Sequence, residues 1–163
     1  MTSNASISEP ALSCSPRETQ RGRRRHLVIA DDCAEMRQFV RDAVGLQFDD
    51  VIEVADGRAL FWALLRSSFA AANATAPELV LITDVAMPVY DGLLVLDAWR
   101  DAQHCVPTIV ITASPSEAVR VRAQDLGVTV LAKPFSITKL RQLVHDVFEV
   151  AGTRYTGRGG QKT

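Results

Sequence analysis

The feature that most constrains this chain is an apolar run that ends in an aspartate. Residues 79–82 are Leu-Val-Leu-Ile, Thr83 and Asp84 follow, and Met87-Pro88 forms a turn soon after. A continuous apolar run bounded by turn residues is typical of a strand buried on both faces, as in parallel sheets covered by helices. In open sheets of this kind, ligands bind beyond the carboxyl ends of the strands. Because an unpaired buried carboxylate is costly, we interpret Asp84 as the chemical centre of the molecule.

Short apolar segments alternate with segments of helical periodicity along the rest of the chain. Runs of Val, Ile and Leu predict strands, and apolar residues at every third or fourth position predict helices. Five strands that alternate with five helices predict an α/β fold, a doubly wound parallel sheet with right-handed crossovers. The predicted strands are 27–30, 51–54, 79–84, 108–112 and 128–132, and the predicted helices are 34–46, 60–69, 93–101, 115–126 and 137–150.

The fourth predicted helix carries end signals of its own. Ser114 is placed to cap the first turn, Pro115 suits the first helical position, and Glu117 is placed to complete a capping box. Gly127 is a suitable C-terminal cap, because glycine adopts the left-handed backbone conformation without a steric penalty. These signals predict a helix that starts just after Ser114 and stops at Gly127.

Composition divides the chain into one folded domain and two tails. Residues 1–25 are poor in large apolar residues and end in a cluster of arginines, which predicts a disordered N-terminal tail. Residues 26–150 hold all the periodic segments, and residues 151–163 form a Gly-rich segment that predicts a flexible C-terminal tail. The 163 residues therefore correspond to a single domain.

Charge and cysteine content point away from several classes of protein. The formal net charge of −1 gives no general attraction to nucleic acid or to a membrane surface. No apolar run approaches the roughly 20 residues that span a bilayer. Cys14, Cys33 and Cys105 are odd in number and follow no metal or disulfide spacing, which favours a reducing compartment. We therefore expect a cytoplasmic protein that contacts neither nucleic acid nor membrane directly.

Polar residues stand where the predicted strands end. Since the carboxyl ends of parallel strands share one edge, we expect these side chains to converge. Neighbouring carboxylates repel one another, and an oxygen-only set of ligands suits Mg²⁺. Carboxylates, a hydroxyl and an ammonium match the needs of phosphoryl transfer, with one aspartate as the nucleophile that forms an acyl phosphate. The residues are Asp31, Asp32, Asp84 (the nucleophile), Thr112 and Lys133.

These residues also carry a family resemblance. From about residue 27 to residue 150, the chain resembles the receiver domain of two-component response regulators, and residues 32–37 are similar to the corresponding segment of the chemotaxis regulators. The resemblance implies a flavodoxin-like sheet with the strand order 2-1-3-4-5. Its motifs, in chain order, are Asp31-Asp32, Asp84 followed by Met87-Pro88, Asp91-Gly92, Thr112-Ala113 and Lys133-Pro134-Phe135.

The resemblance assigns a role to each site residue. Asp84 would accept a phosphoryl group from a phosphohistidine on a sensor histidine kinase, or exchange it with a histidine phosphotransfer protein. Thr112 and Lys133 would bind the phosphoryl oxygens, and the Lys133–Pro134 peptide bond is expected to be cis. The implied Mg²⁺ ligands are Asp31, Asp32, Asp84 and the backbone carbonyl of Ala86.

The resemblance also implies a mode of action. We expect a stand-alone receiver that catalyses only its own phosphorylation and dephosphorylation. Phosphorylation would shift a two-state equilibrium and change the surface formed by the fourth helix, fifth strand and fifth helix, which would contact an unidentified downstream protein.

Some positions depart from the family pattern. An aromatic residue often stands three positions before the lysine, but here that position is Val130, and the segment from Gly127 to Lys133 is one residue short. Coupling through an aromatic side chain is therefore in doubt. Small residues, Ala86 and Ser114, occupy the positions that flank the phosphoryl group, and we hypothesise that they admit water and shorten its lifetime.

Alternative functions remain open to different degrees. A phosphorylation-independent interaction module of the same fold is the main alternative, and Val130 is the residue that keeps it open. Phosphatases of the haloacid dehalogenase type need a second acid two residues after the nucleophile, where this chain has Ala86. A nucleotide-binding protein is disfavoured, because no Gly-rich phosphate loop follows the first strand.

Overall fold

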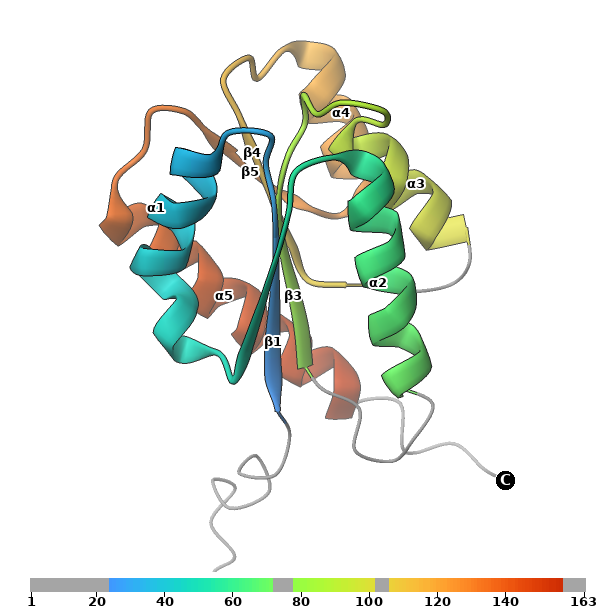
Figure 1. The fold of residues 1–163 in the computed structure, drawn as a ribbon, viewed down its shortest axis with the longest axis vertical. Coiled ribbons are helices and arrows are strands. Elements are labelled where there is room, and N and C mark those ends of the chain that lie inside the picture. Colours follow the sequence, from blue (N-terminus) through green and yellow to red (C-terminus); the bar gives the residue numbers. More distant parts are fainter. Residues whose placement is uncertain (1–23, 72–77, 102–105, 157–163) are drawn as a thin grey trace, which may run out of the picture.

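A parallel β-sheet forms the centre of the molecule in the computed structural model, which describes residues 24–71, 78–101 and 106–156 (Figure 1). The strand order is β2-β1-β3-β4-β5, and every neighbouring pair is parallel. The predicted five-stranded sheet and its order 2-1-3-4-5 are therefore confirmed. The strands are β1 Arg25–Ala30, β2 Asp50–Val54, β3 Glu78–Asp84, β4 Thr108–Thr112 and β5 Thr129–Ala132.

Helices cover both faces of the sheet. Figure 1 shows α1 and α5 on one side of the strands, and α2, α3 and α4 on the other. This is the arrangement that right-handed crossovers on both sides of the first strand produce. The helices are α1 Ala34–Val44, α2 Gly57–Ala71, α3 Gly92–Asp101, α4 Glu117–Leu126 and α5 Ile137–Thr156, with a short 3₁₀ turn at Gly45–Gln47.

The apolar runs in the strands are explained by two hydrophobic clusters, one on each face of the sheet. In β1, Leu27 and Ile29 pack in the cluster with α1 and α5, whereas Val28 and Ala30 pack in the cluster with α2, α3 and α4. Because successive side chains of a strand point to opposite faces, a strand covered on both faces needs an apolar residue at every position. The same alternation places Leu81 of β3 with Val28.

The predicted helix ends are correct in part. Gly127 terminates α4 with a φ of 66°, as predicted. The predicted cap at Ser114 is wrong, because the hydroxyl oxygen of Ser116 accepts the hydrogen bond from Val119 N–H. Ser114 instead donates its own N–H to the Thr112 hydroxyl, which holds it in the preceding loop. Glu117 is consequently the first helical residue and does not close a capping box.

The first and last helices also differ from their predicted lengths. α1 ends at Val44, and the 3₁₀ turn occupies the positions up to Gln47, although the prediction extended the helix to residue 46. α5 continues to Thr156 and so includes residues that were assigned to the C-terminal tail. No helix in the described ranges is both long enough and apolar enough to cross a bilayer. The N-terminal tail before residue 24, Cys14 and Cys105 lie outside those ranges.

Candidate functional site

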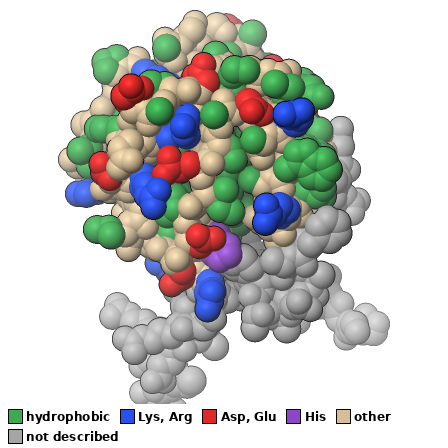
Figure 2. Space-filling view, in the orientation of Figure 1, with side chains coloured by type: hydrophobic (Ala, Val, Ile, Leu, Met, Phe, Trp, Pro, Cys, Tyr) green, Lys and Arg blue, Asp and Glu red, His purple; other side chains and the backbone are tan. Residues whose placement is uncertain are grey.

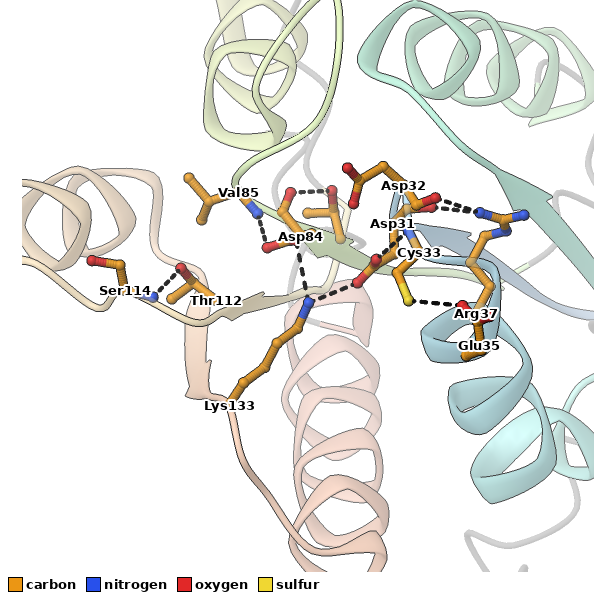
Figure 3. A network of polar contacts seen from close by, with 11 residues as sticks. Asp31, Asp32, Cys33, Glu35, Arg37, Asp84, Val85, Thr112, Ser114 and Lys133 are labelled. Atoms are coloured by element: carbon orange, nitrogen blue, oxygen red, sulfur yellow. Dashed lines mark hydrogen bonds and ion pairs between the residues drawn. The ribbon is translucent and has the colours of Figure 1, made fainter.

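An ammonium group joins two aspartates at the carboxyl edge of the sheet. Lys133 Nζ donates to Asp31 Oδ2 at 2.9 Å and to Asp84 Oδ2 at 3.2 Å (Figure 3). Asp31 follows β1, Asp84 ends β3, and Lys133 follows β5, which lies beyond β4 in the sheet. A long side chain is needed to reach across β4, and lysine supplies it. The structure thus brings these three predicted site residues together.

The third predicted carboxylate lies in the same cluster. One oxygen from each of Asp31, Asp32 and Asp84 lies within 4.8 Å of the others. Asp31 is 3% exposed and Asp84 is 8% exposed, whereas Asp32 is open to solvent. Backbone groups hold the two buried carboxylates, since Cys33 N–H donates to Asp31 Oδ1 at 2.9 Å and Val85 N–H donates to Asp84 Oδ1 at 2.7 Å.

The charges of this cluster do not balance without a further cation. Burial by itself lowers the pKa of Lys133, but hydrogen bonds and charge from Asp31 and Asp84 outweigh burial and leave its pKa raised. Lys133 therefore stays protonated, but it contacts only Asp31 and Asp84, and the cluster holds three carboxylates to one ammonium. The donor set is entirely oxygen and one member is open to solvent, which fits a hard divalent cation that keeps some of its water, such as Mg²⁺.

The other two predicted site residues are Thr112, at the end of β4, and Ala86, in the loop after β3. Thr112 ends β4 and is 4% exposed, one residue beyond Ile111, the register partner of Asp84. Its hydroxyl accepts the hydrogen bond from Ser114 N–H at 3.1 Å, so it is engaged away from Asp84 (Figure 3). Ala86 is an exposed residue in the loop after β3, and the role of its carbonyl stays a prediction.

The loop after β3 is packed tightly against the backbone of Asp84. A Cβ at Gly92 would overlap the Asp84 carbonyl oxygen and press on Thr83 Oγ1, so only glycine fits there. Asp91 Oδ1 accepts from Leu94 N–H at 2.6 Å, so the Asp91-Gly92 motif forms the entry to α3. The requirement for glycine beside Asp84 was not predicted, because it depends on how closely the loop returns to the strand.

Sequence reasoning also missed a residue behind the acidic cluster. Arg37 Nη1 donates to the backbone oxygen of Asp31 at 2.8 Å and lies 3.4 Å from that of Asp32. Arg37 was noted only as part of a family-like segment. The available signal was its position in α1, about one turn after the aspartate pair, from which a long side chain reaches back over the start of the helix.

Two further expectations concern the segment around Lys133. The Lys133–Pro134 peptide bond is cis, as expected. Val130 is half-buried and packs against the cluster that includes α4, next to Val110 of β4. The position that often holds an aromatic residue is therefore filled by a small apolar side chain.

Comparison with known proteins identifies the family. Residues 27–145 match the family described as the response regulator receiver domain. The chain is 30% identical over 126 residues to the probable chemotaxis protein CheY of Rhizobium etli, a match that covers 75% of this chain and 91% of that protein. It is 31% identical over 110 residues to the transcriptional regulatory protein QseB of Haemophilus influenzae, covering 60% of this chain and 50% of QseB.

Solved structures agree with this match. The chemotaxis protein CheY4 of Vibrio cholerae superposes with a TM-score of 0.60 at 25% identity, over 76% of this chain and 98% of that one. A Francisella response regulator receiver domain superposes with a TM-score of 0.64 at 23% identity, over 78% of this chain and 98% of that one, which supports the fold.

Some relatives are much longer than the matched region. The sensor histidine kinase TmoS of Ectopseudomonas mendocina is 28% identical over 127 residues, which is 76% of this chain but only 12% of that protein. The chain likewise spans half the length of QseB. What these proteins share with it is the receiver region, and on that basis the chain belongs to the response regulator receiver domain family of two-component signalling.

Proposed function

We propose that this chain is a Mg²⁺-dependent phosphoryl acceptor, with Asp84 as the acceptor and a histidine kinase or a histidine phosphotransfer protein as the donor. The observation that carries the proposal is the contact of one ammonium, Lys133 Nζ, with the carboxylates of both Asp31 and Asp84. Receiver domains in general accept phosphoryl groups and bind Mg²⁺ at such an acidic pocket, and membership of the family supports the same chemistry here.

The chemistry follows from the placement of the side chains. A carboxylate oxygen of Asp84 attacks the phosphorus of a phosphohistidine, so that an O–P bond forms while the N–P bond breaks and its electron pair stays on the imidazole. Lys133 neutralises charge on the transferred group, and the Thr112 hydroxyl turns from Ser114 N–H to donate to a phosphoryl oxygen.

A bound Mg²⁺ would neutralise developing negative charge on the phosphoryl oxygens. Its ligands in this proposal are the carboxylates of Asp31, Asp32 and Asp84 and the backbone carbonyl of Ala86, with water in the remaining positions. Before phosphorylation, two of these carboxylates, those of Asp31 and Asp84, contact Lys133 and are partly neutralised by it.

A groove beside the site supports the approach of a protein donor. Its lining is largely apolar and comes from α1 and from the segment that joins β5 to α5. The rings of Phe39 and Phe135 meet edge to face there, with centroids 5.9 Å apart. In this proposal, a donor that brings an imidazole to Asp84 rests on this surface, which Lys133 shares with the site. The lining residues are Met36, Phe39, Lys133, Pro134 and Phe135.

The output is proposed to be a protein contact on the face formed by α4, β5 and α5. Val121 of α4 is 49% exposed and Ile137 of α5 is 41% exposed, so this face offers apolar area to an unidentified downstream protein. We place the exchange in the cytoplasm, without direct contact to nucleic acid or membrane. The second candidate is a phosphorylation-independent interaction module, which is favoured by Val130 in place of an aromatic residue.

Incubation with acetyl phosphate and Mg²⁺, followed by intact-mass measurement, tests the proposal. The wild type is expected to gain one phosphoryl group, and Asp84→Asn is expected to gain none. Asp42→Asn is the matched control, because Asp42 is an exposed carboxylate of α1 that bonds only to Gln38 among the side chains described. A wild type that stays unmodified, or an Asp84→Asn variant that is modified equally, would favour the interaction module.

A further inference from the structure

One guanidinium holds the backbone from which two of the acidic side chains project. Arg37 Nη1 donates to the Asp31 carbonyl oxygen at 2.8 Å and lies 3.4 Å from the Asp32 carbonyl oxygen (Figure 3). The chain leaves the β-ladder here, since Asp31 N–H still donates to Val54 O but α1 begins at Ala34. Arg37 thus supplies donors to carbonyls at the turn between strand and helix.

The guanidinium is itself held from the side of the sheet. Arg37 Nε lies 3.7 Å from Glu53 Oε2, and Glu53 Oε1 accepts from Arg41 Nη1 at 2.6 Å. Glu53 lies on β2, where it is the register partner of Ile29. Figure 2 shows acidic and basic side chains side by side over α1 and the neighbouring strand β2. The Arg37 side chain is only 19% exposed, and Glu53 and the two carbonyls together restrict the positions that its guanidinium can take.

The contact of Arg37 with the backbone matters most for the position of the Asp32 carboxylate. The Asp31 carboxylate is fixed by Cys33 N–H and by Lys133, but the Asp32 carboxylate makes no hydrogen bond or ion pair with the residues for which side chains are described. Its position is therefore set by its own backbone, and Arg37 is the side chain that contacts that backbone. Glu53 meanwhile offsets the positive charge of Arg37, which would otherwise oppose a cation at the site.

We propose that Arg37 is a positioning residue for metal binding, which acts by holding the Asp31–Asp32 turn so that both carboxylates face Asp84. This inference rests on the proposed function and deepens it. Side chains that orient metal ligands from behind commonly change metal affinity by about tenfold or more when they are removed. Arg37 touches neither the transferred group nor the donor in this proposal, so its effect should be confined to metal affinity.

Direct metal titration tests the inference without any phosphorylation. Mn²⁺, which takes the same oxygen ligands, is titrated by calorimetry and by its electron paramagnetic resonance signal. Arg37→Met is expected to raise the dissociation constant about tenfold. Arg37→Lys, which keeps one donor but lacks the guanidinium fork, is expected to fall between that variant and the wild type.

Arg41→Met is the matched control. It removes the other arginine that contacts Glu53, and one positive charge, but touches neither carbonyl. Its dissociation constant for Mn²⁺ is expected to stay within twofold of the wild-type value. Loss of positive charge alone would tighten metal binding in both arginine variants, whereas loss of positioning weakens it in Arg37→Met only. Equal effects of the two variants, or a wild-type affinity in Arg37→Met, would overturn the inference.

Phosphorylation by acetyl phosphate then separates this inference from the proposed function. Arg37→Met is expected to need about tenfold more Mg²⁺ for half of its maximal rate and to approach the wild-type rate at saturating Mg²⁺. A wild type that binds Mn²⁺ but is never phosphorylated would contradict the proposed function and leave the positioning role intact. A wild type that is phosphorylated, with an Arg37→Met variant of unchanged Mg²⁺ requirement, would contradict the positioning role alone.

Discussion

Lys133 Nζ lies 3.2 Å from Asp84 Oδ2, although 49 residues separate them along the chain. The same ammonium lies 2.9 Å from Asp31 Oδ2, across 102 residues. Both carboxylates are almost fully buried, since Asp31 is 3% exposed and Asp84 is 8% exposed. Uncompensated buried charge is strongly destabilising, so Lys133 connects the stability of the fold to the chemistry of the site.

Replacement of Lys133 by methionine is expected to lower the free energy of unfolding by about 2 kcal/mol at neutral pH, because Asp31 and Asp84 lose their cation. Mg²⁺ should restore part of this loss, since a ligand that binds only the folded state stabilises it. Urea denaturation with and without Mg²⁺ measures both effects. Lys139→Met, at an exposed position of α5, is the control and should change little. A Mg²⁺ effect no larger in Lys133→Met than in the wild type would contradict this account.

The stabilisation that Lys133 provides through Asp31 and Asp84 should depend on pH in a definite direction. Although burial opposes it, the pKa of Lys133 is raised in the folded state by Asp31 and Asp84. Because the pKa of Lys133 is higher in the folded state than in the unfolded state, its protonated form stabilises the fold. This stabilisation is complete below the unfolded pKa of lysine, about 10.4, and is lost as the pH rises through the pKa of Lys133 in the folded state. The stability difference between the wild type and Lys133→Met should therefore shrink in strongly alkaline solution, which urea titrations across that range measure. A difference that grows there would be inconsistent with the ion pair.

Thr112→Val is expected to slow phosphorylation by acetyl phosphate about tenfold or more, because valine has a similar shape but cannot donate to a phosphoryl oxygen. Thr112→Ser keeps the hydroxyl and should retain most of the rate. The Thr112 hydroxyl is engaged with Ser114 N–H in this structure, so stability of both variants must be checked by thermal unfolding. Equal rates for the valine and serine variants would exclude a role for the hydroxyl.

Gly92→Ala is expected to lower the free energy of unfolding by about 2 kcal/mol or more, because the new Cβ would overlap the Asp84 carbonyl oxygen. Gly45→Ala is the matched control. Gly45 has a φ of −58°, and a Cβ there would meet Arg41 Cγ at 3.4 Å, an ordinary contact. Urea denaturation of both variants distinguishes close approach to Asp84 from a general effect of replacing glycine, which would shift both variants equally.

Val89→Gly is expected to raise the free energy of unfolding by about 0.5 kcal/mol. Val89 has a φ of 72°, a left-handed conformation that strains a β-branched residue by about 1–2 kcal/mol. Glycine relieves that strain but adds conformational entropy to the unfolded chain, which offsets part of the gain. The Val89 side chain is exposed, so the replacement removes little packing. Chemical denaturation of the glycine and alanine variants is the measurement, and an alanine variant more stable than the glycine variant would contradict the strain.

Ala86→Asn is expected to lengthen the lifetime of the phosphorylated protein several-fold, because a larger polar side chain would hinder water at the acyl phosphate. Ala86 and Ser114 are both exposed in the structure, as the hypothesis of an open site requires. Intact mass followed over time after removal of the phosphate donor gives the decay rate. An unchanged or faster decay would count against the idea that small flanking residues shorten the lifetime.

The sequence alone determined the architecture and the composition of the acidic edge. Apolar residues at every position of residues 79–82 require cover on both faces, and the alternation of strands and helices then leaves few topologies. Parallel strands bring their carboxyl ends to one edge, so a list of strand-end residues was sufficient to group Asp31, Asp84 and Lys133. Periodicity and strand polarity are local properties, and local properties are readable from the chain.

Contacts between elements were decided only by the tertiary structure. Ser116 rather than Ser114 caps α4, whereas Ser114 lies in the preceding loop, where its N–H donates to the Thr112 hydroxyl. Gly92 is required by the return of a loop to Asp84, and Arg37 acts on the turn that carries Asp31. Each of these depends on where a loop lies and how far a side chain reaches. Such distances follow from packing of the whole domain, and the one local signal among them was the place of Arg37 about one turn after the aspartate pair.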